Sequence, residues 1–188
     1  MQQDSFITVK WMPSLESYTT YVEVNLEPHI TPDYFKRFFD KLRTEVKNIT
    51  PECTSIRELC VEEGKYSTTV ETFAFPLLSE RYAVVTQYRS LDYQGTPGNH
   101  LLLASSRGNE DKYNDDYLGK GFTKSRVLQE TFLSVYHCKR KPDGKLIMVW
   151  MTELNRKGIP EWIFLKLQLM KTTSLFKGIY NVLATQHE

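Results

Sequence analysis

The amino-acid sequence predicts an α+β fold in which a curved, mostly antiparallel sheet encloses one long C-terminal helix. Runs of β-branched and aromatic residues, separated by turn residues, recur along most of the chain. The last run gives way near Lys157–Trp162 to helical periodicity that continues to about Ala184. A helix of roughly 23 residues is ~35 Å long, so it needs a large concave partner. The pattern alone fits a solid core as well as a hollow one.

Eight strands and one further helix are expected before the C-terminal helix. Thr31 is a suitable N-cap for the further helix, Pro32 fits its first turn, and aromatic residues recur at helical spacing until the pattern ends before Pro51. Turn residues at Glu63–Lys65 support one of the hairpins. The strands are expected at Phe6–Trp11, Tyr18–Leu26, Ser55–Glu63, Tyr66–Phe75, Tyr82–Ser90, His100–Ser106, Arg126–Cys138 and Lys145–Glu153.

Length and composition favour one domain, spanning 1–188, without disulfides. The 24 Lys and Arg against 23 Asp and Glu give a net charge of +1, so no nucleic-acid partner is expected. No apolar run reaches the ~18 residues that span a bilayer, and the first residues do not form a secretory signal. We therefore expect a cytoplasmic protein. The polar segment Arg107–Gly121 is long for a connection, and such loops tend to be functional or mobile.

Motifs for catalysis and for metal or cofactor binding are not found in the sequence. The four histidines lack metal-ligand spacing, and no nucleophile elbow, P-loop or dinucleotide fingerprint occurs. Neighbouring Glu62 and Glu63 point to opposite faces of a strand, which is poor geometry for a carboxylate pair. We expect no metal, no cofactor and no enzymatic activity.

Two charges fall on strand faces that otherwise look apolar. Strand alternation groups Arg81 with Ala83 and Val85, and it groups Glu153 with the apolar residues of the strand before it. An unpaired buried charge costs several kcal/mol, roughly, so an inward Arg or Glu must meet a partner or a polar ligand group. Alternatively, Arg81 reaches water from the start of its strand, and Glu153 points past the core.

The order of several short motifs resembles a known family. Glu71–Tyr82 (ETFAFPLLSERY) forms a strand, a proline-bearing turn and an Arg-aromatic strand start; Ala104–Ser106 is a serine-containing strand end; and Gly158–Trp162 (GIPEW) opens the last helix. From about Tyr66 to Ala184 the chain resembles the START (StAR-related lipid-transfer) domains, most of all the phosphatidylcholine-transfer-protein branch. Tyr82 stands where the family usually has Asp.

This resemblance implies a helix-grip fold, of the START and Bet v 1 type, with an internal hydrophobic tunnel that takes one lipid. Implied functions are lipid binding and transfer between membranes, with transient membrane contact by a monomer peripheral to membranes. A helix-grip enzyme for small hydrophobic substrates and a protein-interaction module are alternatives. The lid is expected at the turn Gly95–Asn99 and at Gly178. The residues expected to contact lipid are Arg81, Tyr82, Trp150 and Glu153 on the strands, and Leu165, Leu169, Phe176 and Tyr180 on the helix.

Overall fold

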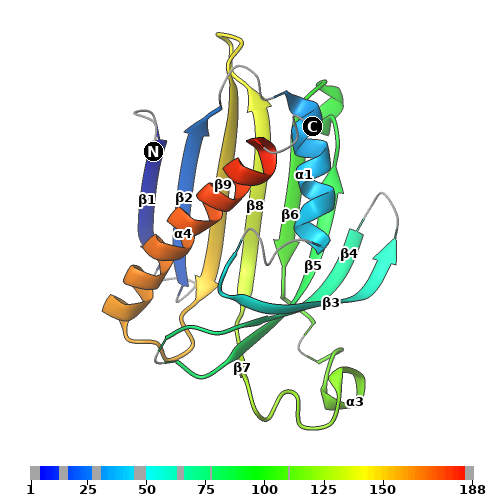
Figure 1. Cartoon of the computed structure of the whole chain (residues 1–188), viewed down its shortest axis with the longest axis vertical. Coiled ribbons are helices and arrows are strands. Elements are labelled where there is room, and N and C mark those ends of the chain that lie inside the picture. The colour runs from blue at the N-terminus through cyan, green and yellow to red at the C-terminus, as the bar shows by residue number, and fades with distance from the viewer. Residues whose placement is uncertain are drawn as a thin grey trace.

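The computed structural model describes residues 5–12, 17–26, 31–44, 50–62, 66–76, 78–109 and 111–184. They form one nine-stranded sheet and two long helices, α1 and α4 (Figure 1). The helices are α1 Pro32–Thr44, the short α3 Asp115–Leu118 and α4 Glu161–Ala184, with a 3-10 turn at Tyr93–Gly95. The strands are β1 Ser5–Met12, β2 Ser17–Asn25, β3 Cys53–Glu62, β4 Tyr66–Phe73, β5 Arg81–Ser90, β6 His100–Ser105, β7 Val127–Leu128, β8 Thr131–Arg140 and β9 Leu146–Asn155.

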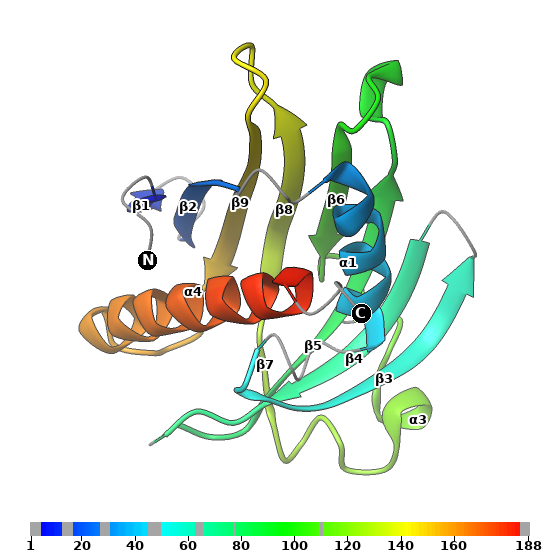
Figure 2. The same cartoon turned by 45° about the horizontal axis from the view of Figure 1, so that its top comes forward.

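The strand order in the sheet is β1-β2-β9-β8-β6-β5-β4-β3, with β7 attached to β5. Every pair along that path is antiparallel, and only the short β7 runs parallel to β5. Figure 2 shows the sheet curling forward at β3 and β4, so that α4 and α1 lie side by side within the curve. The predicted fold, a curved antiparallel sheet around a long C-terminal helix, is therefore confirmed.

The expected strands agree with the observed ones to within two residues at each end, apart from one that is split. The strand expected at Arg126–Cys138 is interrupted at Gln129 and Glu130, which separate β7 from β8. The turn expected at Glu63–Lys65 lies outside the described residues. The hydrogen-bonded ladder of β8 with β9 is long and runs from the Thr131–Leu154 pair to the Arg140–Leu146 pair.

The main core fills the concave side of the sheet. Phe35 and Phe39 of α1 are fully buried and meet edge to face, with ring centroids 6.4 Å apart. Leu175 and Ile179 of α4 pack into the same cluster, together with Val22, Leu102, Met148 and Trp150 from three strands. This end of α4 is thereby held against α1 and the sheet.

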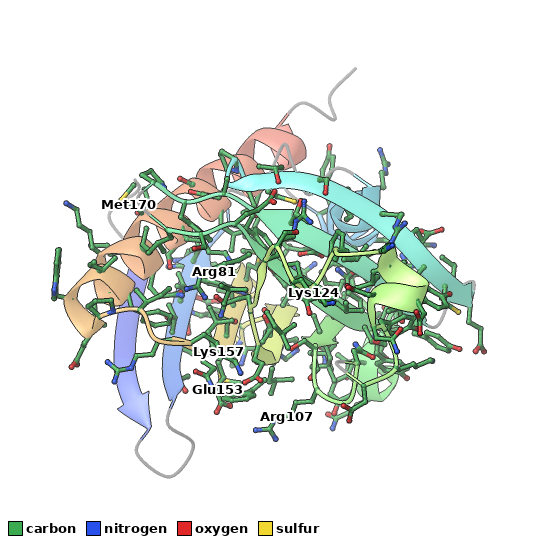
Figure 3. The ribbon with its side chains drawn as sticks, turned by 90° about the horizontal axis from the view of Figure 1, so that it is seen from below. Arg81, Arg107, Lys124, Glu153, Lys157 and Met170 are labelled. Carbon is green, nitrogen blue, oxygen red and sulfur yellow. The ribbon has the colours of Figure 1, made fainter. Side chains whose placement is uncertain are left out.

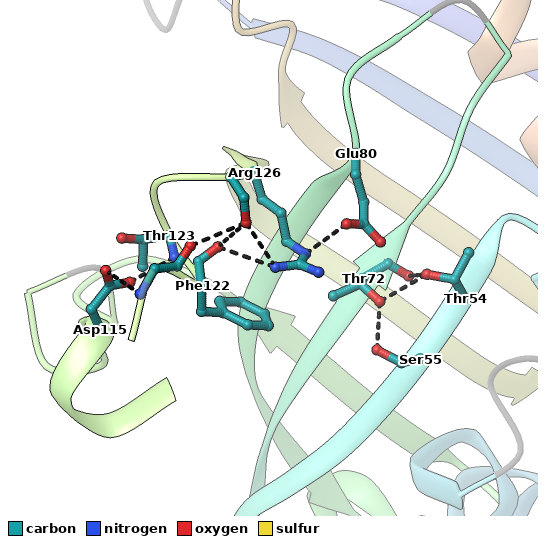
Figure 4. Close-up of polar contacts among 10 residues, drawn as sticks. Thr54, Ser55, Thr72, Glu80, Asp115, Phe122, Thr123 and Arg126 are labelled. Carbon is teal, nitrogen blue, oxygen red and sulfur yellow. Dashed lines mark hydrogen bonds and ion pairs between the residues drawn. The ribbon is translucent and has the colours of Figure 1, made fainter. Parts of the chain in front are cut away.

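The segment between β6 and β7 covers the convex side of the sheet. Tyr113, Leu118 and Phe122 from this segment pack against the outward residues Tyr82 and Val84 of β5. The Asp115 carboxylate accepts hydrogen bonds from the backbone N–H groups of Gly121 and Thr123, and the Arg126 Nε lies 2.8 Å from Glu80 (Figure 4). This long connection, including the predicted loop Arg107–Gly121, is packed against the sheet.

The hairpin between β5 and β6 is fixed against α1. A Cβ atom at Gly98, whose φ is +75°, would lie 2.7 Å from Pro32 Cγ, so a side chain at this position clashes with the start of α1. His100 is buried beneath the hairpin, and its Nδ1 accepts a hydrogen bond from the Asp92 backbone N–H at 3.2 Å. The predicted lid turn is thus packed on a helix.

Burial of His100 makes the stability of the chain sensitive to acid. Burial lowers the pKa of His100 below its ordinary 6.5; the carboxylates of Asp92 and Asp33 oppose this shift, and Lys36 adds to it. Because the unfolded chain then takes up the proton more readily, this contribution to stability is complete above pH 6.5 and is lost as the pH falls below it. We expect His100→Asn to flatten the fall in the free energy of unfolding between pH 7 and 5, measured by urea titration. If His100→Asn leaves the pH dependence of the free energy of unfolding unchanged, His100 is not its source. The His137→Asn variant measures the contribution of His137, the second histidine whose pKa is lowered.

A cavity between the sheet and the C-terminal helix as candidate site

A cavity of about 100 Å³ lies between the concave face of the sheet and the first half of α4. Strands β4, β5, β6, β8 and β9 supply its floor, and α4 supplies its roof through Phe164, Leu167, Gln168, Lys171 and Leu175. Residues from four connections close it: Thr50, Phe75, Gln129 and Ile159. The volume suffices for several waters but is below the roughly 300–1,000 Å³ of pockets that hold drug-sized ligands.

The floor combines apolar and polar side chains in similar numbers. Its apolar residues are Phe73, Ala83, Val85, Ala104, Trp150 and Leu154. The Trp150 indole N–H donates to Ser134 Oγ at 3.1 Å, so its polar edge is satisfied within the sheet. Burial, and next the carboxylate of Glu71, raise the pKa of Tyr136, which therefore stays a neutral phenol.

Two groups of opposite charge lie in the wall. Glu71 on β4 is 8% exposed, and Thr69 Oγ1 donates to it at 3.2 Å. Burial raises the pKa of its carboxyl, and Lys171 opposes that shift. Lys171 on α4 places its Nζ 5.3 Å from the centre of the Phe73 ring. Burial lowers the pKa of the Lys171 amine, and the carboxylates of Glu71 and Glu52 oppose this shift. Each charge thus partly compensates the other.

Gln168 brings an uncompensated polar atom into the roof. Its side chain is 5% exposed, and its Oε1 is buried without a hydrogen-bond partner. Thr172 Oγ1 donates at 2.7 Å to the backbone oxygen of Gln168, which leaves the side-chain amide oxygen without a donor. Most buried polar atoms in proteins have a partner, so this acceptor needs an explanation.

The predicted strand residues fall on both faces of the sheet. Trp150 lines the cavity. Arg81 is 5% exposed and is not among the residues that line the cavity. Its Nη1 donates at 3.3 Å to Oε1 of Gln129, which does line the cavity, while the Arg81 Nε is buried without a hydrogen-bond partner. Tyr82 packs on the convex side against Phe122, with centroids 5.4 Å apart. Glu153 belongs to the same face as Ile147, as expected, but that face is convex; Figure 3 shows Glu153 farther from α4 than Arg81. Tyr82 and Glu153 therefore do not contact the cavity.

The inward face of α4 differs from the one implied by the predicted lipid contacts on the helix. The buried residues are Phe164, Gln168, Thr172, Leu175 and Ile179. Leu165 and Leu169, expected to contact lipid, are 36% and 54% exposed and do not line the cavity. The side chains of Phe176 and Tyr180 lie outside the described residues.

Sequence reasoning missed the polar residues of the wall. Glu71 stands two residues before Phe73 and so shares its strand face, a signal that was available. Gln168 and Lys171 gave no such signal. When a helix carries apolar residues on two sides, its sequence does not show which side faces the sheet. Neither the turn Gly95–Asn99 nor Gly178 is among the described residues that line the cavity.

The described residues offer neither a metal site nor a membrane-spanning helix. They contain no cluster of His, Cys, Asp and Glu placed to hold a metal ion. No helix among them is long and apolar enough to cross a membrane.

The architecture matches several solved structures. Human StAR-related lipid transfer protein 5 matches with a TM-score of 0.75 at 11% identity, over 100% of this chain and 85% of that one. A StAR-related lipid transfer protein from Xanthomonas axonopodis matches with a TM-score of 0.72 at 12% identity. The match covers 98% of this chain and 96% of that one. The lipid transfer and protein localization domain of human StarD13 matches with a TM-score of 0.70 at 13% identity. The match covers 97% of this chain and 86% of that one. No family model and no curated protein matches the chain. At these identities the likeness shows a shared fold.

Proposed function

Because the chain has the helix-grip fold of the StAR-related lipid-transfer domains, we propose that residues 1–188 act as one lipid-binding domain that carries a lipid between membranes. The observation that carries the proposal is the cavity between the sheet and α4, where six apolar side chains of the strands lie on the floor. No chemical step is proposed.

Binding of a lipid requires this cavity to enlarge. At about 100 Å³ it does not hold a long acyl chain, so α4 or the connections beside it move outward when ligand enters. Burial of a chain contributes about 0.8 kcal/mol per CH₂, which offsets the loss of the bilayer environment. We propose Trp150 as a ligand contact and Arg81 as a residue that positions Gln129 in the wall.

The outer face of α4 supports transient contact with a membrane. Trp162 is 70% exposed, and Leu169 and Met170 are about half exposed on the same helix. Lys166 lies among them and is exposed as well. An apolar face that carries a lysine suits the interface of a bilayer with anionic lipids. We propose that this face rests on the membrane during lipid exchange, directly above the cavity roof.

Filling the cavity tests the proposal. Ala83 on β5 and Ala104 on β6 are buried in its floor, so we expect Ala83→Leu and Ala104→Leu to occupy the space that the ligand needs. Transfer of a fluorescent phospholipid between vesicles is expected to fall at least about tenfold, and native mass spectrometry of the purified protein should show the co-purified lipid lost.

Ala74→Leu is the matched control, because Ala74 is exposed after the end of β4. It should leave lipid transfer and co-purified lipid unchanged. Wild-type protein that carries no lipid and accelerates no transfer would overturn the proposal. Turnover of an added hydrophobic substrate would instead support an enzyme.

A further inference from the structure

Two connections of the chain meet at one end of the cavity and are joined by polar side chains. The first links β7 to β8 and consists of Gln129 and Glu130. The second leads from Asn155, the last residue of β9, through Lys157 into α4. Gln129 lines the cavity, and so does Ile159 from the second connection. The contacts between the two connections therefore decide whether the cavity is closed at this end.

The carboxylate of Glu130 holds the second connection with both of its oxygens. Its Oε1 lies 2.5 Å from Nζ of Lys157, and its Oε2 accepts a hydrogen bond at 3.1 Å from Nδ2 of Asn155. The backbone oxygen of Glu130 also accepts from the backbone N–H of Asn155 at 3.1 Å. Oδ1 of Asn155 in turn accepts at 2.9 Å from the backbone N–H of Lys157. Glu130, Asn155 and Lys157 thus form one connected unit, which we call the polar latch.

The backbone of Lys157 is strained while the polar latch is closed. Its φ is +44°, in the left-handed region that residues with a Cβ atom rarely adopt, and Gly158 after it has a φ of +75°. The contact of Nζ with Glu130 and the contact of the backbone N–H with Asn155 hold Lys157 in this conformation. When the ion pair is lost, the backbone of Lys157 relaxes more readily, and the connection into α4 is free to move.

The polar latch is accessible and weak enough to be opened by a competing anion. The side chains of Lys157 and Glu130 are 33% and 24% exposed, and such ion pairs contribute little to stability because water and salt screen them. Lys157 lies at the end of the molecule that Figure 3 shows, shortly before the exposed Trp162 of the proposed membrane face. Phosphate groups of anionic lipids offer the Lys157 ammonium the same kind of contact as the Glu130 carboxylate.

We propose that the polar latch of Glu130, Asn155 and Lys157 keeps the cavity closed in solution, and that an anionic membrane surface opens it by drawing Lys157 away from Glu130. This inference rests on the proposed lipid transfer and names how the membrane regulates it. Lipid exchange is thereby confined to contact with a membrane, and the cavity stays closed between two contacts.

Breaking the ion pair without a membrane charge tests the proposal. Transfer of a fluorescent phospholipid is measured between phosphatidylcholine vesicles with and without added phosphatidylserine. We expect wild type to transfer faster with phosphatidylserine present. Glu130→Gln should raise transfer between the neutral vesicles about two- to fivefold and shrink the response to phosphatidylserine. Glu161→Gln removes the same charge from the exposed first residue of α4, so as the matched control it should not raise transfer between neutral vesicles.

Hydrogen exchange of the wild-type protein measures opening of the polar latch directly. The backbone N–H groups of Asn155, Lys157 and Ile159 are all hydrogen-bonded in the closed state. We expect them to exchange faster on vesicles that contain phosphatidylserine than on neutral vesicles. Inorganic phosphate added to neutral vesicles, compared with chloride at equal ionic strength, should not have this effect. The N–H groups in the ladder of β8 with β9 serve as the unchanged reference.

The outcomes separate the polar latch from the proposed function. If Glu130→Gln transfers no faster than Glu161→Gln between neutral vesicles, the ion pair does not keep the cavity closed. If phosphatidylserine leaves exchange at Asn155, Lys157 and Ile159 unchanged, or inorganic phosphate accelerates it equally, the membrane surface is not what opens the latch. Lipid transfer stands in both cases. If wild type carries no lipid and transfers none between vesicles of either composition, the proposed function itself fails.

Discussion

A crosslink between the roof of the cavity and the connection that follows β4 is expected to stop lipid transfer. Leu78 in that connection and Ile163 in the first turn of α4 both pack against the small cluster of Leu154, Ile159 and Phe164. The cavity is too small for a lipid as it stands, and we expect the ligand to enter at this end. Joining Leu78→Cys to Ile163→Cys, by a disulfide or a short thiol crosslinker, should lower the rate of transfer between vesicles at least about tenfold, and cleavage of the link should restore it.

The native cysteines permit this experiment with one further change. Cys53 and Cys138 are buried, and burial raises the pKa of Cys138 to about 12, so both remain unreactive thiols. Cys60 is exposed and is replaced by Ser. A control link joins Tyr88→Cys to Leu103→Cys, which are already paired between β5 and β6. Equal transfer by the linked and unlinked Leu78–Ile163 protein, with the link verified by mass, would show that the ligand enters elsewhere.

The effects of removing Glu71 and Lys171 on the stability of the fold are expected not to add. Glu71→Gln leaves the buried ammonium without its main neighbour, and Lys171→Met leaves the buried carboxylate uncompensated. We expect the double variant to be more stable at pH 7, by at least about 1 kcal/mol, than the sum of the two single effects predicts. Urea unfolding of the four proteins measures this coupling. Strictly additive effects would show that the two charges do not interact.

The pH dependence gives a second readout of the same pair. Because burial raises the pKa of Glu71 above its ordinary 4.5, the folded chain holds this proton more tightly than the unfolded chain. The contribution of Glu71 is therefore complete below pH 4.5 and is lost as the pH rises through the folded-state pKa. Lys171→Met should make this fall steeper, whereas Lys166→Met, on the exposed face of α4, should leave it unchanged.

The fold could be predicted closely from the sequence because its strands and helices each carry a local signal. Alternation of residue type marks β4, β5 and β9 to within two residues, and Pro32 marks the start of α1. Whether a side chain reaches the cavity depends on which face of its strand or helix points to the concave side of the sheet. Alternation correctly grouped Glu153 with Ile147, but periodicity does not say on which side the sheet bends.

The candidate site could be predicted only in part for a related reason. The most apolar arc of α4 includes Leu165 and Leu169, yet the structure exposes them and buries Gln168. Hydrophobicity predicts the buried face of a helix when that face meets a dry core. Here the inward face of α4 meets a cavity with polar groups in its wall. Hydrophobicity therefore predicted Leu165 and Leu169, which lie on the outer face of the helix.

The pairing of β2 with β9 has a consequence for synthesis of the chain. Ser17 pairs with Asn155 and Asn25 with Ile147, so strands from opposite ends of the sequence lie side by side. As the chain leaves the ribosome, the hairpin of β1 and β2 has no strand to join until β9 emerges near the end of translation. Contacts of such long sequence separation form slowly, and an open strand edge attracts other chains meanwhile. A nascent chain arrested before Leu146 should therefore expose β2 to chaperones, whereas one arrested after Asn155 has its sheet complete.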